Sequence, residues 1–390
     1  YKIVQMHGPE NRSENGPEVK TFLGIELRKL PEVDGLRFFA ISLVLLHHVY
    51  TDYNPFMLWQ KKYGWVGVDI FFTLSGFLIT FLLLKEHESK GRISLKQFWI
   101  RRALRLWPSW VLVLLFSLPV LFYFGRNNPQ VILNLQKYIG YYFIHLANYA
   151  NILIGGIHST LAHYWSLALE EHFYVIWPPV LMAMLRWKKI SWALLTSLLI
   201  LPYLARVWHH THAVAFDEGL RNFIHEATHT RIDSLAWGCG LAIYLKKMPK
   251  LNMKLEGVTL LASCAIFFFA LHYFYELTAS PWQRSLSYTL ISIATCLLIW
   301  IALKGDDRGL RRILRWPILA WAGMMSYGVY LVHPLINVLL YAIQKHLSIE
   351  IPMGILIFLM FLLPYGPAAL MYYFLDRKIE KIKVRFRPMS

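Results

Sequence analysis

The sequence predicts an all-α, polytopic integral membrane protein, and two observations support this class. Of the 390 residues, 56% are hydrophobic and only 16% are charged, below the quarter that is typical of soluble domains. Apolar stretches of about 20 residues recur along the chain, and each is long enough to cross a hydrocarbon core of about 30 Å as a helix. We therefore expect about ten transmembrane helices and no separate soluble catalytic domain.

The ten predicted spans are joined by polar loops that differ sharply in charge. The spans cover residues 34–53, 64–84, 106–124, 165–185, 190–208, 232–245, 255–275, 286–303, 318–342 and 353–375. Of the 40 Lys and Arg residues, 30 lie in the N-terminal segment and in alternate loops and the tail, at 85–105, 186–189, 246–254, 304–315 and 376–387.

This alternation orients the bundle. Basic residues concentrate in cytoplasmic loops, so both termini are expected in the cytoplasm. The net charge of +17 could also indicate nucleic-acid binding, but its confinement to short loops favours topology, and no nucleic-acid partner is expected. If the apolar segment 133–155 crossed the membrane, every later loop would lie on the opposite side and the basic loops would be outside. The segment is therefore interpreted as an interfacial or re-entrant element on the outer side.

Three parts are expected along the chain. Residues 1–30 form a polar cytoplasmic tail, residues 31–376 the membrane domain, and residues 377–390 a basic cytoplasmic tail. No signal peptide is evident before the first span, so the first helix itself is expected to direct insertion.

Within the first span, Arg37 and His48 are the most informative pair of residues. Eleven residues are close to three helical turns, so both side chains project from nearly the same face, roughly 16 Å apart along the axis. Ionisable groups at membrane depth are costly and usually mark a site. A neutral imidazole can act as a general base toward a hydroxyl, although a histidine that is merely hydrogen-bonded within the bundle is an equal alternative.

A cluster of arginines stands at the start of the third span. Arg102 and Arg105 are one turn apart and face the same way, and Arg101 precedes them. Guanidinium groups suit a phosphorylated ligand, but a basic helix end can equally serve topology or contact anionic lipid.

Further ionisable groups lie in or beside later spans. Glu170 and Glu171 enter the fourth span together; a Glu170–Tyr174 hydrogen bond is the structural alternative to a functional role. Arg231 and Asp233 flank one residue of the sixth span and cannot face each other on an ideal helix. Each therefore either pairs elsewhere in the bundle or lies at the interface.

Three other features complete the inventory of candidates. Asp69 in the second span is expected to neutralise an arginine such as Arg37. His333 precedes Pro334, which removes a backbone donor and opens the helix locally. The histidines at 209, 210, 212, 225 and 229 lack the accompanying carboxylate or Cys pattern of a metal site, so no metal is predicted.

Taken together, several segments resemble the acyltransferase-3 family of bacterial membrane O-acyltransferases. The matching stretches are DGLRFFAISLVLLHH, VGVDIFFTLSGFLI, FWIRRALRLWP, HYWSLALEEHFYVIWP, TRIDSLAWGCGLA and SYGVYLVHP. They occur in the family's order from residue 34 to about residue 335. The resemblance implies a ten-helix domain in the bacterial inner membrane, in a stand-alone form with no SGNH-type hydrolase domain.

The family's roles transfer to matching positions of this chain. Arg37 and His48 match an R-x10-H motif whose histidine is taken as the catalytic base. Arg102 and Arg105 match an RxxR motif associated with the acyl donor. Glu170 matches the acidic position of the WSLxxE segment and His333 the histidine after SYxxYL. Supporting or acceptor-site roles are expected for Asp69, Glu171, Arg231, Asp233 and Tyr330.

The resemblance implies transfer of an acyl group, commonly acetyl, from cytoplasmic acetyl-CoA or another acyl-CoA to a hydroxyl of a surface glycan. On this hypothesis Glu170 either orients His48 or binds the acceptor. Direct transfer and an acyl-histidine intermediate both remain open. The acceptor could instead be a small molecule or lipid such as a macrolide. A transporter coupled to protons or anions is the alternative from another class. Neither acceptor identity nor oligomeric state is specified.

Overall fold

The structure is a computed structural model of the chain. It describes residues 21–22, 25–26, 30–49, 63–126, 128–154, 159–212, 223–274 and 280–383. Most of the predicted N-terminal tail, the end of the first predicted span and residues 384–390 of the predicted basic tail lie outside these ranges.

The described residues confirm an all-α protein. The only strands among them are β1 (Thr21–Phe22) and β2 (Ile25–Glu26), which form one short antiparallel pair. The first half of the bundle contains α1 (Pro31–His47), α3 (Val66–Lys90), α4 (Leu95–Gly125), α5 (Pro129–Phe143), α6 (Ala147–Ile154), α7 (Ser159–Ala162), α8 (Tyr164–Arg186) and α9 (Lys188–His212). The second half contains α11 (Thr228–Tyr244), η1 (Leu245–Lys247), α12 (Met253–Phe269), η2 (Ala270–Phe274), α13 (Pro281–Lys304), α14 (Leu310–Leu314), α15 (Pro317–Met324), α16 (Ser326–Leu347), α17 (Met353–Leu362), α18 (Tyr365–Met371), η3 (Tyr372–Asp376) and α19 (Arg377–Lys383).

Helices occupy all ten predicted spans in the part of the chain that the structure describes. By length and composition, 7 helical segments there could cross a membrane. They are Val66–Lys90, Leu95–Tyr123, Lys188–His212, Met253–His272, Pro281–Lys304, Ser326–Leu347 and Met353–Ile379. The other three predicted spans correspond to α1, α8 and α11. The chain is thus a multi-pass membrane protein, and the count of ten crossings remains a prediction.

One predicted span is divided in the structure. The span predicted at 318–342 comprises α15 and α16, which are separated at Met325, and uniform hydropathy concealed this break. The last predicted span runs through α17 and α18; Pro364, between them, has no N–H for the helical hydrogen bonds, but Met353–Ile379 remains one segment that could cross a membrane.

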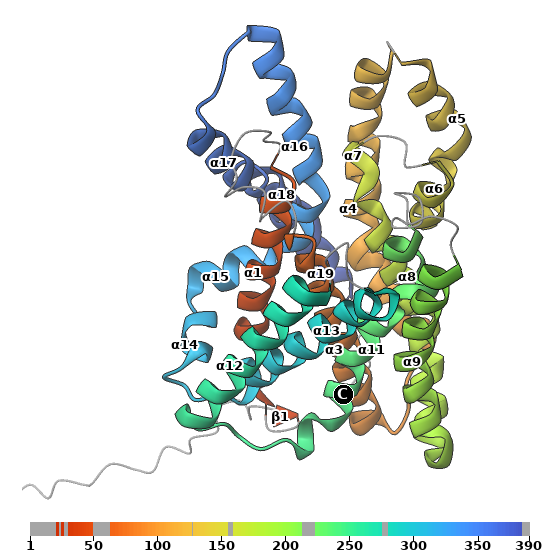
Figure 1. Cartoon of the computed structure of the whole chain (residues 1–390), viewed down its shortest axis with the longest axis vertical. Helices are drawn as coiled ribbons and strands as arrows, with labels where there is room; N and C mark the ends of the chain where they lie inside the picture. Colours follow the sequence, from red (N-terminus) through yellow and green to blue (C-terminus); the bar gives the residue numbers. More distant parts are fainter. Residues whose placement is uncertain are drawn as a thin grey trace, which may run out of the picture.

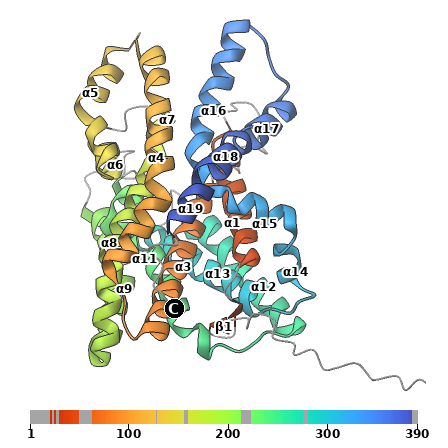
Figure 2. The ribbon, with the colours of Figure 1, turned by 180° about the vertical axis from the view of Figure 1, so that it is seen from behind.

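Figures 1 and 2 show two arms that rise from a common base. One arm contains α4 and α5, and the other contains α16 and α17. The base contains α3, α11, α12 and α13. One apolar core joins the arms to the base. Buried side chains of α1, α3, α4, α8 and α16 all belong to this single cluster.

At the centre of the base, α3 and α11 pack with almost no space between their backbones. A Cβ atom on Gly76 would lie 1.9 Å from the Leu235 carbonyl oxygen, and one on Gly238 would lie 2.0 Å from the Thr73 carbonyl oxygen. Only glycine permits this approach, which is typical of close helix packing in membranes. The position of α3 is therefore fixed by α11.

The segment 129–154 forms a hairpin beside α4. Helix α5 turns back along α4, so the His145 ring after its end lies 4.1 Å from the ring of Trp110, near the middle of α4. Helix α6 then folds against α5, and Tyr142 donates a hydrogen bond to Asn151 at 2.6 Å. No helix in 129–154 is among the 7 segments that could cross a membrane. The interfacial or re-entrant placement of this segment stays a prediction.

Candidate active site

An open pocket of about 860 Å³ lies between five helices, and it is the candidate site. Its walls come from α1, α3, α4, α8 and α16. This volume includes space that is open to solvent. Four of the residues predicted from sequence, Arg37, Arg102, Arg105 and Glu170, line this pocket together with Tyr330.

The pocket carries a strong positive charge. Arg37, Arg102 and Arg105 enter it from two helices. Arg37 also forms an ion pair with Asp34 at 3.5 Å, one turn earlier on α1. Arg101 is not among the lining residues and pairs with Glu86 at 2.6 Å. Of the three arginines at the start of α4, Arg102 and Arg105 thus face the pocket, and Arg101 joins α4 to α3.

Glu170 lies in the same pocket, and its two carboxylate oxygens are both occupied. Ser75 donates to Oε1 at 2.8 Å and Tyr174 donates to Oε2 at 2.7 Å. The intrahelical Glu–Tyr bond considered from sequence is therefore present. These contacts place Glu170 with the arginines rather than beside His48. Glu171, next in the chain, does not line the pocket and hydrogen-bonds with Trp107.

Contacts along the pocket define two ends. At the arginine end, the Arg102 guanidinium lies 5.8 Å from the centre of the Tyr174 ring. Glu170 and Ser75 lie at the middle. At the inner end, the hydroxyls of Ser166 and Tyr330 lie 2.6 Å apart, and each is within 3.2 Å of the His163 carbonyl oxygen.

His48 lies beyond this inner end. It follows directly after α1, and its Nδ1 lies 2.9 Å from the Val44 carbonyl oxygen. Because a carbonyl only accepts, Nδ1 carries the proton and Nε2 presents its lone pair. Asn337 of α16 donates to the His48 carbonyl oxygen at 3.2 Å and ties the end of α1 to that helix.

Two further imidazoles connect His48 to the pocket. Pro334 has no N–H for the Tyr330 carbonyl one turn earlier, and His333 Nδ1 donates to that oxygen instead at 2.7 Å. The His333 ring centre lies 4.9 Å from that of His48 and 5.4 Å from that of His163. The expected local opening at Pro334 is thus filled by a side chain that the helix itself supplies.

These contacts make one continuous polar series. The arginines lead to the hydroxyls of Ser166 and Tyr330, and the Tyr330 ring centre lies 5.3 Å from His163 and 5.6 Å from His333. His48 follows. A ligand with an anionic group at the arginine end could thus place a reactive carbonyl near the hydroxyl pair, next to the imidazoles.

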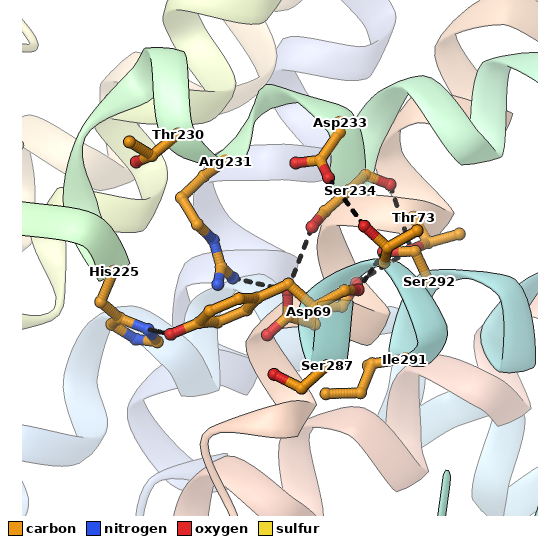
Figure 3. A network of polar contacts seen from close by, with 12 residues as sticks. Asp69, Thr73, His225, Thr230, Arg231, Asp233, Ser234, Ser287, Ile291 and Ser292 are labelled. Carbon is orange, nitrogen blue, oxygen red and sulfur yellow. Dashed lines mark hydrogen bonds and ion pairs between the residues drawn. The ribbon is translucent and has the colours of Figure 1, made fainter. Parts of the chain in front are cut away.

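Asp69 neutralises an arginine, as expected, but its partner is Arg231 and not Arg37. Asp69 accepts from Arg231 at 2.5 Å and from Ser234 at 3.2 Å, and the side chains of both Asp69 and Arg231 are fully buried (Figure 3). The packing of α3 on α11 determines which arginine pairs with Asp69, and the position of Asp69 on α3 alone does not.

Asp233 and Arg231 have separate partners elsewhere in the bundle, which is the first of the two alternatives that the helix geometry left open. Asp233 forms a two-point ion pair with Arg206 of α9, at 2.7 and 2.8 Å. Figure 3 shows Arg231 and Asp233 on α11, with Asp69 reached by Arg231. None of Asp69, Arg231 and Asp233 lines the pocket. The Asp69–Arg231 pair joins the lining helix α3 to α11, and the Asp233–Arg206 pair joins α11 to α9.

Sequence analysis missed three buried polar residues. His163 and Ser166 stand two turns and one turn before Glu170, and that spacing was an available signal. Arg206 is fully buried near the end of the predicted span 190–208, where an arginine is costly and should have been noted. In the described part of the chain, no three His, Cys, Asp or Glu side chains converge to hold a metal ion.

Comparison with known proteins identifies the family. A family model described as an acyltransferase domain, Acyl_transf_3, matches residues 30–372. The peptidoglycan O-acetyltransferase OatA of Listeria monocytogenes is 32% identical over 315 residues, covering 78% of this chain and 49% of OatA. No solved structure is significantly similar.

Two other relatives carry provisionally assigned activities. YrhL of Bacillus subtilis, provisionally a peptidoglycan O-acetyltransferase, is 30% identical over 370 residues, covering 90% of this chain and 55% of YrhL. A provisional O-acetyltransferase of Staphylococcus aureus strain COL is 29% identical over 325 residues, covering 79% and 50%. The chain spans about half the length of the curated relatives it matches. Because the family model matches residues 30–372, from the start of α1 to the start of η3, the chain belongs to the acyltransferase-3 family.

Proposed function

We propose that this protein is an O-acetyltransferase of the bacterial inner membrane that takes its acyl group from acetyl-CoA on the cytoplasmic side and passes it to a hydroxyl of a cell-surface glycan. The observation that carries the proposal is the continuous series from three arginines, through a hydroxyl pair, to His48. The names of the relatives favour peptidoglycan as the acceptor.

In this proposal, the arginine end binds the phosphates of coenzyme A. Arg102 and Arg105 provide fixed forks of N–H donors, which suit phosphate groups. Glu170 accepts hydrogen bonds from Ser75 and Tyr174, and in this proposal the N–H donors of the arginines are used for the ligand. The thioester arm then extends along α3 toward Ser166 and Tyr330.

The transfer step uses His48 Nε2 as the base. The acceptor hydroxyl loses its proton to Nε2 while its oxygen forms a bond to the thioester carbonyl carbon. The carbon–sulfur bond breaks, and the leaving thiolate takes up the proton held on His48 Nε2, which gives free coenzyme A and restores the neutral imidazole. Ser166 and Tyr330 have one O–H each; when one of the two donates to the other, the second is suited to donate to the carbonyl oxygen as negative charge develops there.

The test is release of free thiol from acetyl-CoA by the full chain in lipid nanodiscs, supplied with peptidoglycan fragments. His48→Ala should lose at least a hundredfold in kcat with little change in donor affinity, because general base catalysis is worth about 10²–10⁴. His47→Ala is the matched control, since its ring neighbours that of His48 but the His48 contacts to Val44 and Asn337 remain. Equal activity of wild type and His48→Ala would refute this role.

The donor site is tested separately by binding. Arg102→Gln and Arg105→Gln should each weaken acetyl-CoA binding by tenfold or more, because a hydrogen bond to a charged group is worth roughly 1.5–3 kcal/mol. Arg101→Gln should keep its affinity, because Arg101 pairs with Glu86 outside the pocket. Substrate flux across the membrane without any covalent product would instead favour a transporter.

A further inference from the structure

Helix α3 presents a single accessible stripe to the pocket. Between Val66 and Leu83, only four of its side chains are not buried, and all four line the pocket: Phe71, Ser75, Leu78 and Leu82. Their spacing of four, three and four residues places them on one helical face. Three of the four are apolar, so the wall between the arginines and the hydroxyl pair suits an uncharged chain.

Phe71 closes this stripe at the inner end. Its ring centre lies 6.4 Å from that of Tyr330, in an edge-to-face arrangement. Beyond Phe71, the next lining residue of α3 is Val68, which is buried. A chain that passes the hydroxyl pair of Ser166 and Tyr330 would therefore meet the Phe71 ring.

The wall cannot move back to make room. The close approaches at Gly76 and Gly238 leave α3 no space to shift toward α11. The buried Asp69–Arg231 ion pair joins the same two helices two residues from Phe71. Any extra length of a bound chain must thus be accommodated by Phe71 itself.

We propose that Phe71 sets the acyl-chain length and restricts the donor to acetyl and similarly short acyl groups. This inference rests on the proposed function. The thioester carbonyl lies at the Ser166–Tyr330 hydroxyls and the acyl methyl group contacts the Phe71 ring. Longer chains are excluded because their added methylenes would overlap the ring.

The experiment compares thiol release from acetyl-, butyryl- and hexanoyl-CoA by the full chain in nanodiscs. Wild type should favour acetyl-CoA, and Phe71→Ala should raise the butyryl-to-acetyl ratio of kcat/KM by at least tenfold, since one or two methylenes in a shaped pocket are worth about 10–200-fold. Phe71→Leu should give an intermediate ratio and serves if the alanine variant does not fold. Leu82→Ala, at the arginine end of the same stripe, should leave the ratio unchanged.

The outcomes separate the two proposals. An unchanged ratio in both Phe71 variants, with acetyl transfer retained, would overturn the length-setting role and leave the proposed function standing. An equal shift in Leu82→Ala would also overturn it, because the effect would then not be local to the inner end. A wild-type chain that neither binds nor cleaves any acyl-CoA would overturn both.

Discussion

Removing one partner of the buried Asp69–Arg231 pair should destabilise the bundle far more than removing both. The two side chains have no solvent exposure, their closest atoms are 2.5 Å apart, and they join α3 to α11. Asp69→Ala would leave the Arg231 guanidinium buried without its carboxylate. Breaking a buried pair in this way costs about 3–5 kcal/mol, a large share of a typical unfolding free energy of about 5–15 kcal/mol.

The double variant Asp69→Leu with Arg231→Met provides the decisive comparison. Replacing a whole buried pair by apolar residues of similar volume is often neutral or stabilising. We therefore expect the double variant to recover most of the loss seen in Asp69→Ala. The surface pair Glu88–Lys246, at 3.9 Å and largely exposed, is the control, and its removal should cost less than about 1 kcal/mol.

The assay is the free energy of unfolding in mixed detergent micelles, followed by circular dichroism, for each single variant and the double variant. The reasoning fails if Asp69→Ala unfolds within 1 kcal/mol of wild type. It also fails if the double variant loses the sum of the two single losses, since additive effects would mean that the two charges do not compensate each other.

Three other variants test separate parts of the structure. Gly76→Ala should sharply lower both thermal stability and acetyl transfer, because its Cβ would lie 1.9 Å from the Leu235 carbonyl oxygen; full activity would refute the close packing. Asn337→Ala should reduce kcat about fivefold without changing KM for acetyl-CoA, since His48 loses one positioning hydrogen bond worth about 1 kcal/mol; an altered KM alone would contradict this. Burial raises the pKa of Glu226 to about 8, so the free energy of unfolding should fall as pH rises from about 4.5 through 8, by up to about 1.4 kcal/mol per pH unit. This slope should flatten in Glu226→Gln; identical pH profiles of thermal stability for the variant and wild type would show that Glu226 does not cause it.

Local periodicity explains what the sequence could predict. The step of three residues from Arg102 to Arg105 places both on one helix face, and both do line the pocket. The same reasoning excluded a mutual pair of Arg231 and Asp233, and each has a separate partner. These predictions depend only on the geometry within one helix, which hydropathy and spacing already define.

Contacts between helices could not be predicted in the same way. Asp69 and Arg231 are 162 residues apart, and nothing in either segment indicates that α3 packs on α11. The spacing of Arg37 and His48 suggested one shared groove. In the structure Arg37 lines the pocket, whereas His48, directly after the end of α1, does not and lies against His333. The break at Met325 was missed because both sides of it are equally apolar.

The walls of the pocket also bear on how the protein is made. Its lining begins at Arg37 and ends at Tyr330, so the first and the ninth predicted spans both contribute to it. A chain emerging from the ribosome has four of the five walls, from α1, α3, α4 and α8, before α16 has been inserted. A chain interrupted before α16 therefore has the arginines and Glu170 but lacks Tyr330, so the hydroxyl pair at the inner end of the pocket forms only when the ninth predicted span is in place.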